Sequence, residues 1–77
     1  METRTIDIVG MLAHLTGWGG WSEIQGPDTG VGVDYHYRAG SREAYINIDQ
    51  DHMTVSVDGE NVFAGDVGEE AVRRFIR

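Results

Sequence analysis

The apolar positions of the chain follow a helical period at both ends and a period of two between them. Residues 5–16 carry apolar side chains three and four positions apart, and Gly17 follows at the place where helices commonly end on a left-handed glycine. The pattern therefore predicts a helix over residues 5–16. Gly10 lies inside it at a cost of up to ~1 kcal/mol relative to Ala, so we expect another element to approach closely there.

The middle of the chain alternates apolar and polar residues, as strands with one buried face do. The alternation covers "VGVDYHYR" at 31–38, "AYINID" at 44–49 and "HMTVSV" at 52–57. If Ile46 and Val55 point into the core, Tyr45, Asn47 and Asp49 project from the opposite face or its edges. The three segments therefore predict strands that expose one polar face.

Turn signals extend this region. Asp58-Gly59 is a strong signal for a two-residue hairpin, because that turn needs a positive φ at both residues, so residues 60–65 should return as a strand. Residues 21–25 are a candidate for a further strand, closed by the turn residues "GPDTG" at 26–30. Together the segments predict an antiparallel meander of four or five strands.

Residues 66–77 return to helical spacing. Asp66 is a good N-cap, Glu69 stands in capping-box register with it, and arginines occupy the last turn, where cations are favoured. A sheet with one apolar face must be covered, so we expect an α+β fold in which an N-terminal and a C-terminal helix pack on one face of the meander sheet. No linker or repeat divides the chain, and we interpret residues 1–77 as a single domain.

The charge balance is strongly acidic. Thirteen Asp and Glu stand against six Arg and no Lys, for a formal net charge of −7, and the stretch from Glu43 to Glu70 holds eight carboxylates and no arginine. Nucleic acid and anionic membranes repel such a polyanion, so we expect no direct nucleic-acid binding. The acidic stretch is either a solvated surface, as in salt-adapted proteins, or an electrostatic face for a basic partner.

Length and composition limit the size of the core, the chemistry available to the protein and its cellular compartment. A domain of 77 residues buries only roughly 60–65% of the surface of its unfolded chain, so the core is thin. The absence of Cys excludes a disulfide framework, a thiolate zinc site and a Cys nucleophile, and it fits a reducing cytoplasm. No apolar run approaches the ~20 residues that span a bilayer, and no signal-type segment opens the chain. We therefore expect a cytoplasmic protein without membrane association.

The catalytic and ligand-binding motifs in the sequence are incomplete. "DQDHMTVSVDGE" has the acidic spacing of a calcium loop, but Met53 and Thr54 stand where an EF-hand needs an oxygen ligand and a glycine. His14, His36 and His52 lie at no metal-binding spacing, and the last two are expected as neighbours on the exposed sheet face. No phosphate loop or nucleophile elbow is present in the sequence. We expect no enzymatic activity, no metal and no cofactor.

The two tryptophans, Trp18 and Trp21, lie in "GWGGW" between the first helix and the sheet. A thin core can use them as filling, so at least one is expected to turn inward. Trp is also enriched in binding hot spots, and neighbouring glycines let a partner's backbone come close. Tyr45 lies nearby in the predicted fold, so we expect an aromatic patch beside an acidic sheet. The same aromatic residues could also stack on a sugar.

The chain resembles in type the small acidic inhibitors encoded by phages and mobile elements, the anti-CRISPR proteins in particular. The resemblance is carried by the short single domain, the absence of a catalytic signature, the net charge of −7 and the arginine-free stretch "EAYINIDQDHMTVSVDGENVFAGDVGEE". It implies a protein that blocks a CRISPR effector complex by presenting carboxylates to its basic DNA-binding surface, as a nucleic-acid mimic. The group shares no sequence motif, so no residue role is carried over from it.

Two hypotheses follow from the sequence. In the first, the protein inhibits a basic nucleic-acid-binding protein, with Asp49, Asp51, Asp58 and Glu60 as the main electrostatic contact and Trp18, Trp21 and Tyr45 as further partner-binding residues. In the second, it is a small cellular or haloarchaeal domain whose acidity is solvation only and which acts in assembly or ligand binding through its two tryptophans. Either protein is expected to be a monomer or a small homo-oligomer.

Overall fold

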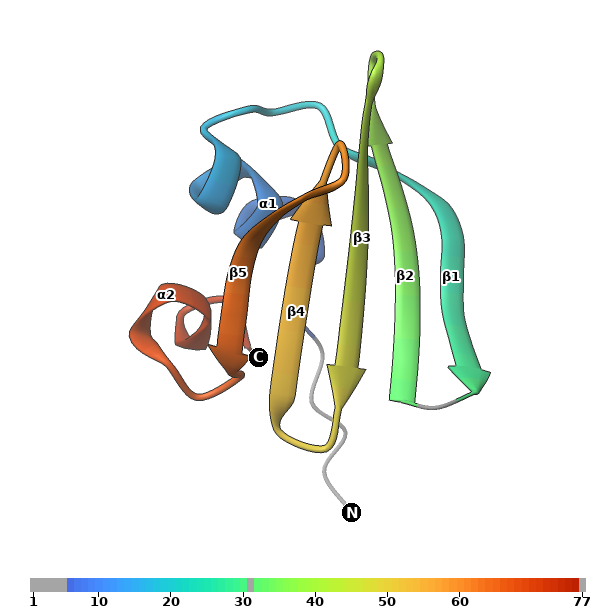
Figure 1. Cartoon of the computed structure of the whole chain (residues 1–77). Coiled ribbons are helices and arrows are strands. Elements are labelled where there is room, and N and C mark those ends of the chain that lie inside the picture. The colour runs from blue at the N-terminus through green and yellow to red at the C-terminus, as the bar shows by residue number, and fades with distance from the viewer. Residues whose placement is uncertain (1–5, 31, 77) are drawn as a thin grey trace.

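The computed structural model describes residues 6–30 and 32–76, with the backbone alone for residues 27–30. The elements are α1 (Ile8–Thr16), β1 (Ser22–Gly30), β2 (Gly32–Ala39), β3 (Arg42–Asp49), β4 (His52–Val57), β5 (Glu60–Asp66) and α2 (Glu70–Arg73). Each strand pairs antiparallel with the next, so the sheet order is β1-β2-β3-β4-β5 (Figure 1). The α+β class and the meander are confirmed. Thr5, Val31 and Arg77, which the predicted elements include, lie outside the described residues.

Helix α1 begins and ends on local signals. Asp7 is the N-cap, and its Oδ1 accepts a hydrogen bond of 3.1 Å from the backbone N–H of Gly10. Gly17 closes the helix with a φ of 72°, and its N–H donates to the carbonyl of Ala13 over 2.8 Å. A Cβ at Gly10 would lie 2.6 Å from Asp7 Oδ2. The closest approach at Gly10 therefore comes from the helix's own cap.

Helix α2 is a single turn, not the helix predicted over residues 66–77. Half of the expected capping box forms, since Glu69 Oε1 accepts a hydrogen bond of 3.1 Å from the N–H of Asp66, but Glu69 itself is the N-cap of α2. After α2 the chain turns to meet the N-terminal segment, where the N–H of Asp7 donates to the carbonyl of Phe75 over 2.8 Å. Because a helix of one turn gains little from its own hydrogen bonds, this long-range pairing decides where it ends.

Strand β1 continues through residues 26–30, which the sequence predicts as a turn. Its register against β2 shifts on both sides of Gln25, so two irregularities absorb the glycine and proline of this stretch. Pro27 lacks an N–H and is tolerated because β1 is an edge strand. Strand β2 opens at Gly32 with a φ of 82°, where a Cβ would lie 2.7 Å from the carbonyl oxygen of Ile48, so only glycine fits.

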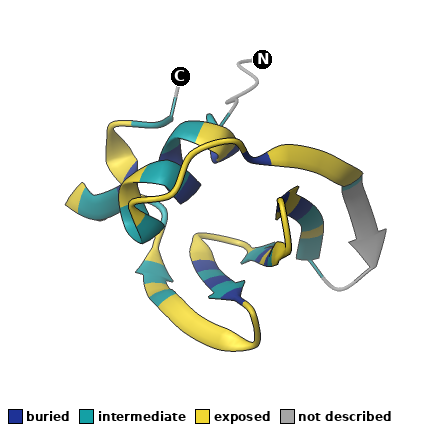
Figure 2. Ribbon diagram, turned by 90° about the horizontal axis from the view of Figure 1, so that it is seen from above, coloured by how far each residue is buried: buried dark blue, intermediate teal, exposed yellow. Residues whose placement is uncertain are grey.

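Alternate residues of the central strands point into one buried cluster, as their period of two predicts. The cluster consists of Ile8, Met11, Leu12, Trp21, Tyr37, Ala39, Ala44, Ile46, Met53, Val55, Val57 and Val72. Both helices therefore share a core with β2, β3 and β4. They lie beside and partly behind β5 in Figure 1 and on one side of the molecule in Figure 2, so the expected packing of both helices on one face of the sheet is not confirmed. Burial raises the pKa of the Tyr37 phenol, and the nearby Glu23 carboxylate raises it further.

Candidate functional site: the open face of the sheet

The side of the sheet opposite the buried cluster carries polar side chains in cross-strand rows. One row consists of Gln25, His36, Tyr45 and Ser56, and the next row contains Asp34, Asn47 and Thr54. We call these seven residues the open face. Directly paired residues of antiparallel strands have Cβ atoms about 4.5–5.5 Å apart, so each row is a continuous line of contacts across the strands.

The open face is hollowed into a shallow groove of about 360 Å³. Its lining consists of the seven open-face residues together with Tyr35 and Ile46. Among these described lining residues, Asp34 supplies a carboxylate and no arginine is present. The groove is therefore rich in hydrogen-bond acceptors and carries negative charge.

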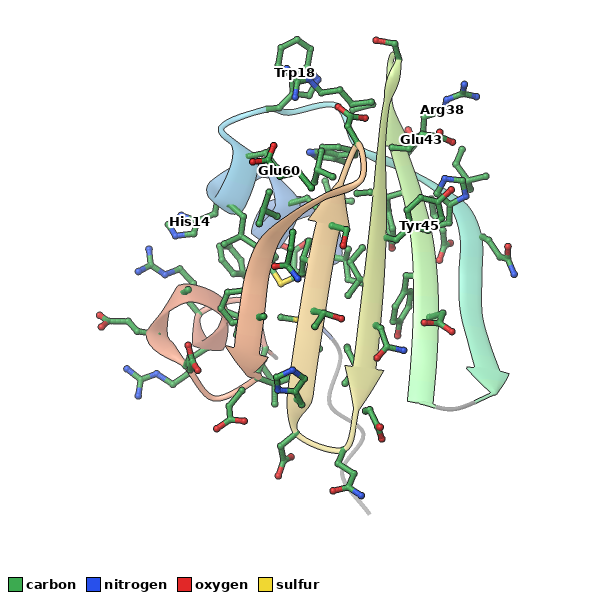
Figure 3. The ribbon with its side chains drawn as sticks, viewed as in Figure 1. His14, Trp18, Arg38, Glu43, Tyr45 and Glu60 are labelled. Atoms are coloured by element: carbon green, nitrogen blue, oxygen red, sulfur yellow. The ribbon has the colours of Figure 1, made fainter. Side chains whose placement is uncertain are left out.

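Tyr45 and His36 form a stacked pair in this groove. Their ring centroids are 4.4 Å apart and their planes differ by 10°. Glu43 Oε1 lies 3.2 Å from His36 Nε2 and holds the imidazole in place (Figure 3 labels Glu43 and Tyr45). Tyr45 is 52% exposed. The imidazole thus supports the phenol ring, which remains open to solvent.

Asp34 and Asn47 form a second pair, one row away. Asn47 Nδ2 donates a hydrogen bond of 2.7 Å to Asp34 Oδ1. This bond orients the carboxylate while Asp34 stays exposed. Both pairs are built by the register between β2 and β3.

The four carboxylates that the sequence predicts as the electrostatic contact lie outside the groove, at opposite ends of β4. Asp49 ends β3 and Asp51 lies in the β3–β4 turn, Asp58 lies in the β4–β5 turn and Glu60 begins β5, and all four are exposed. A strand of six residues at about 3.4 Å per residue separates the two ends by about 20 Å. The fold therefore keeps the two pairs apart, with the open face between them.

Asp58 also has a structural role. Its Oδ1 accepts a hydrogen bond of 3.0 Å from the N–H of Glu43, and its Oδ2 lies 3.8 Å from Arg42 Nη1. Asp58 and Gly59 have φ values of 53° and 81°, which confirms the predicted two-residue hairpin. The carboxylate of Asp58 thus ties the β4–β5 turn to the start of β3.

The two tryptophans have opposite environments. Trp21 is 4% exposed, and its Nε1 donates a hydrogen bond of 2.8 Å to the carbonyl of Trp18. Trp18 is 48% exposed and lies at the top of the molecule in Figure 3, with Arg42 Cζ 4.6 Å from its ring centroid. The expectation that at least one tryptophan turns inward is confirmed for Trp21. Trp18 is available on the surface.

The alternation in the sequence places Asn47 and His36 on the exposed face together with Tyr45, but it does not show which of these residues pair. The pairing of His36 with Tyr45 and of Asp34 with Asn47 depends on the β2–β3 register. The expectation that His36 and His52 are neighbours is wrong. His36 pairs with Tyr45 and His52 pairs with Asp49, four residues further along β3, so the two imidazoles lie towards opposite ends of the sheet.

The described part of the chain holds no group of three or more His, Asp or Glu side chains arranged to bind a metal ion. Within residues 6–30 and 32–76, neither helix has the length and apolar character needed to cross a membrane. Comparisons of the chain with protein-family models, curated proteins and solved structures give no match.

Proposed function

We propose that the protein is a non-enzymatic inhibitor that binds the basic surface of a nucleic-acid-binding protein, as anti-CRISPR proteins do with CRISPR effector complexes. The observation that carries the proposal is the placement of Asp49 and Asp51 at one end of β4 and of Asp58 and Glu60 at the other, with the open face between them. Negative charge held on a rigid sheet at two separated points complements a groove that normally binds phosphates. The proposal places the protein in the cytoplasm, as a monomer or a small homo-oligomer.

Paired neutralisations test this function. One variant combines Asp49→Asn with Asp51→Asn, and another combines Asp58→Asn with Glu60→Gln; asparagine keeps an oxygen acceptor and tolerates the positive φ of Asp58. The measurement is inhibition of DNA binding by purified CRISPR effector complexes over a series of NaCl concentrations. Exposed charges contribute about 0.2–1 kcal/mol each, so each pair should weaken inhibition roughly two- to thirty-fold and reduce its salt dependence.

The matched control combines Glu23→Gln with Glu70→Gln. Both carboxylates are exposed, Glu23 belongs to β1 and Glu70 to α2, and this pair changes the net charge by the same two units, from −7 to −5. If the turn variants inhibit as well as the control at every salt concentration, the acidity is solvation only and the proposed contact is wrong.

The exposure of Trp18 supports the second hypothesis, a domain that acts in assembly or ligand binding through this residue. Its discriminating variant is Trp18→Ala, which leaves all carboxylates in place. Loss of partner binding in Trp18→Ala, with full binding by both turn variants, favours this alternative over electrostatic inhibition.

A further inference from the structure

The open-face groove has a composition that selects among charged groups. The residues that line it offer the Asp34 carboxylate, the side-chain oxygens of Gln25 and Asn47, and the hydroxyls of Thr54 and Ser56. Each of these groups can accept a hydrogen bond, and none carries a positive charge. The Asp34 carboxylate disfavours anionic groups such as phosphate and attracts a donor-rich cation.

The stacked pair adds a preference for a flat cation. The ring centroids of His36 and Tyr45 are 4.4 Å apart, so the imidazole covers one face of the phenol ring, and Tyr45 is still 52% exposed. A cation over an aromatic face is stabilised by about 0.5–1 kcal/mol at exposed sites. A guanidinium group is planar, stacks on aromatic rings and carries five N–H donors, whereas an ammonium group is a compact and strongly hydrated point charge.

Carboxylate, amide and hydroxyl acceptors lie one cross-strand row from this ring. Asn47 engages Oδ1 of Asp34 at 2.7 Å, which fixes the carboxylate beside the row that contains Tyr45. A guanidinium on the open side of Tyr45 would therefore lie beside charged and neutral acceptors of the next row. The groove volume of about 360 Å³ lies in the range of pockets that hold small organic groups.

We propose that the open-face groove is the receptor for a single arginine side chain of the basic partner. Its guanidinium stacks on Tyr45 and donates to Asp34 and the neighbouring acceptors. This inference rests on the proposed function and deepens it, because the carboxylates at the two ends of β4 attract a basic surface and the groove selects arginine on it. The partner is thus a protein with an exposed arginine, not lysine alone, on its phosphate-binding surface.

A capped Gly-Arg-Gly peptide, with Gly-Lys-Gly for comparison, is the probe. Amide shifts of the ¹⁵N-labelled protein report binding, and a single side chain should bind with a Kd on the order of millimolar. We expect the arginine peptide to shift amides of β2, β3 and β4 around Tyr45, and the lysine peptide to bind at least about threefold more weakly. Tyr45→Ala should weaken arginine binding roughly two- to fivefold, whereas Tyr45→Phe, which keeps the ring, should retain it.

Asp34→Asn and Asp51→Asn form a matched pair, because each removes one exposed carboxylate and only Asp34 lines the groove. Asp34→Asn should weaken arginine binding at least about threefold, and Asp51→Asn should leave it within error. Equal binding of both peptides, or equal weakening by the two variants, overturns the inference and leaves the proposed inhibition standing. Arginine selectivity in a protein whose turn variants inhibit normally supports the receptor and contradicts the proposed carboxylate contact.

Discussion

Trp21 and Trp18 are three residues apart and contribute differently to the stability of the fold. Trp21 is 4% exposed within a cluster of a dozen buried residues, so few neighbours can move into the space that its removal would leave. Trp18 is half exposed and contacts the guanidinium of Arg42. The indole of Trp18 stabilises the fold only through a surface contact, and solvent can replace that contact when it is lost.

Replacing each tryptophan by alanine should therefore give unequal losses of stability. Trp21→Ala should lower the free energy of unfolding by ~3–5 kcal/mol, the usual cost of truncating a buried aromatic side chain. Trp18→Ala should lower it by ~0.5–1 kcal/mol, the scale of an exposed cation–π contact. Urea unfolding followed by far-UV circular dichroism measures both, with Trp18→Ala as the control for Trp21→Ala. Similar losses in the two variants would contradict the assignment of Trp21 to the core.

At the scale of elements, features set by neighbouring residues are predicted well from the sequence. The Gly17 C-cap and the Asp58-Gly59 hairpin depend on backbone conformations that glycine and aspartate favour, and both form as predicted. The C-terminal helix is followed by a pairing far along the chain, the Ile6–Ile76 bridge, which no local pattern reveals. The end of β1 pairs with adjacent residues of β2, Gly30 with Gly32, so there the glycine and proline content favoured a turn where the hairpin continues.

The same division applies to the site. The exposure of Tyr45 and of the turn carboxylates follows from alternation and turn signals in the sequence. The stacking on His36 and the pairing of Asp34 with Asn47 require the register between β2 and β3, which a repeated apolar pattern leaves undetermined by steps of two residues. Sequence therefore predicts which face is polar, and the structure is needed to find the groove on it.

The β3–β4 turn contains a non-glycine residue in a backbone conformation that glycine favours. Gln50 has a φ of 56°, in the left-handed region that costs a residue with a Cβ roughly 1–2 kcal/mol. Gln50→Gly removes this cost but adds about 0.5–1 kcal/mol of chain entropy to the unfolded state. We expect a net gain of about 0.5–1 kcal/mol, measured as the free energy of unfolding in urea. Gln50→Ala is the control, because it removes the same side chain and keeps the Cβ; an equal gain in that variant would assign the effect to the glutamine side chain instead of the backbone.

At the scale of the whole molecule, charge is distributed unevenly along and over the fold. Among the described residues, Arg42 pairs with Asp58 and His36 contacts Glu43, both pairs are partly exposed, and no arginine lies between Glu43 and Glu70. The carboxylates at the two ends of β4 therefore repel one another across a rigid sheet. Excess charge of one sign destabilises a compact state through self-repulsion, so the feature that suits a basic partner lowers the stability of the free protein.

This cost should appear as a stability that rises with salt. The Debye length falls from about 30 Å at 0.01 M salt to about 10 Å at 0.1 M salt. The second value is shorter than the separation of the two turns, so added NaCl should screen their repulsion and raise the melting temperature. A gain of about 1 kcal/mol corresponds to about 4–8 °C in a domain of this size.

The matched variant has Asp49, Asp51 and Asp58 changed to Asn and Glu60 changed to Gln, for a net charge of −7 + 4 = −3. In low salt it should melt at or above the temperature of the parent, and its melting temperature should rise less with added NaCl. Calorimetry of both proteins at 0.01 M and 0.1 M NaCl measures the difference. Parallel salt responses would show that these four carboxylates are not the source of the repulsion, and a parent that melts at a lower temperature in 0.1 M NaCl would show that attractive pairs dominate.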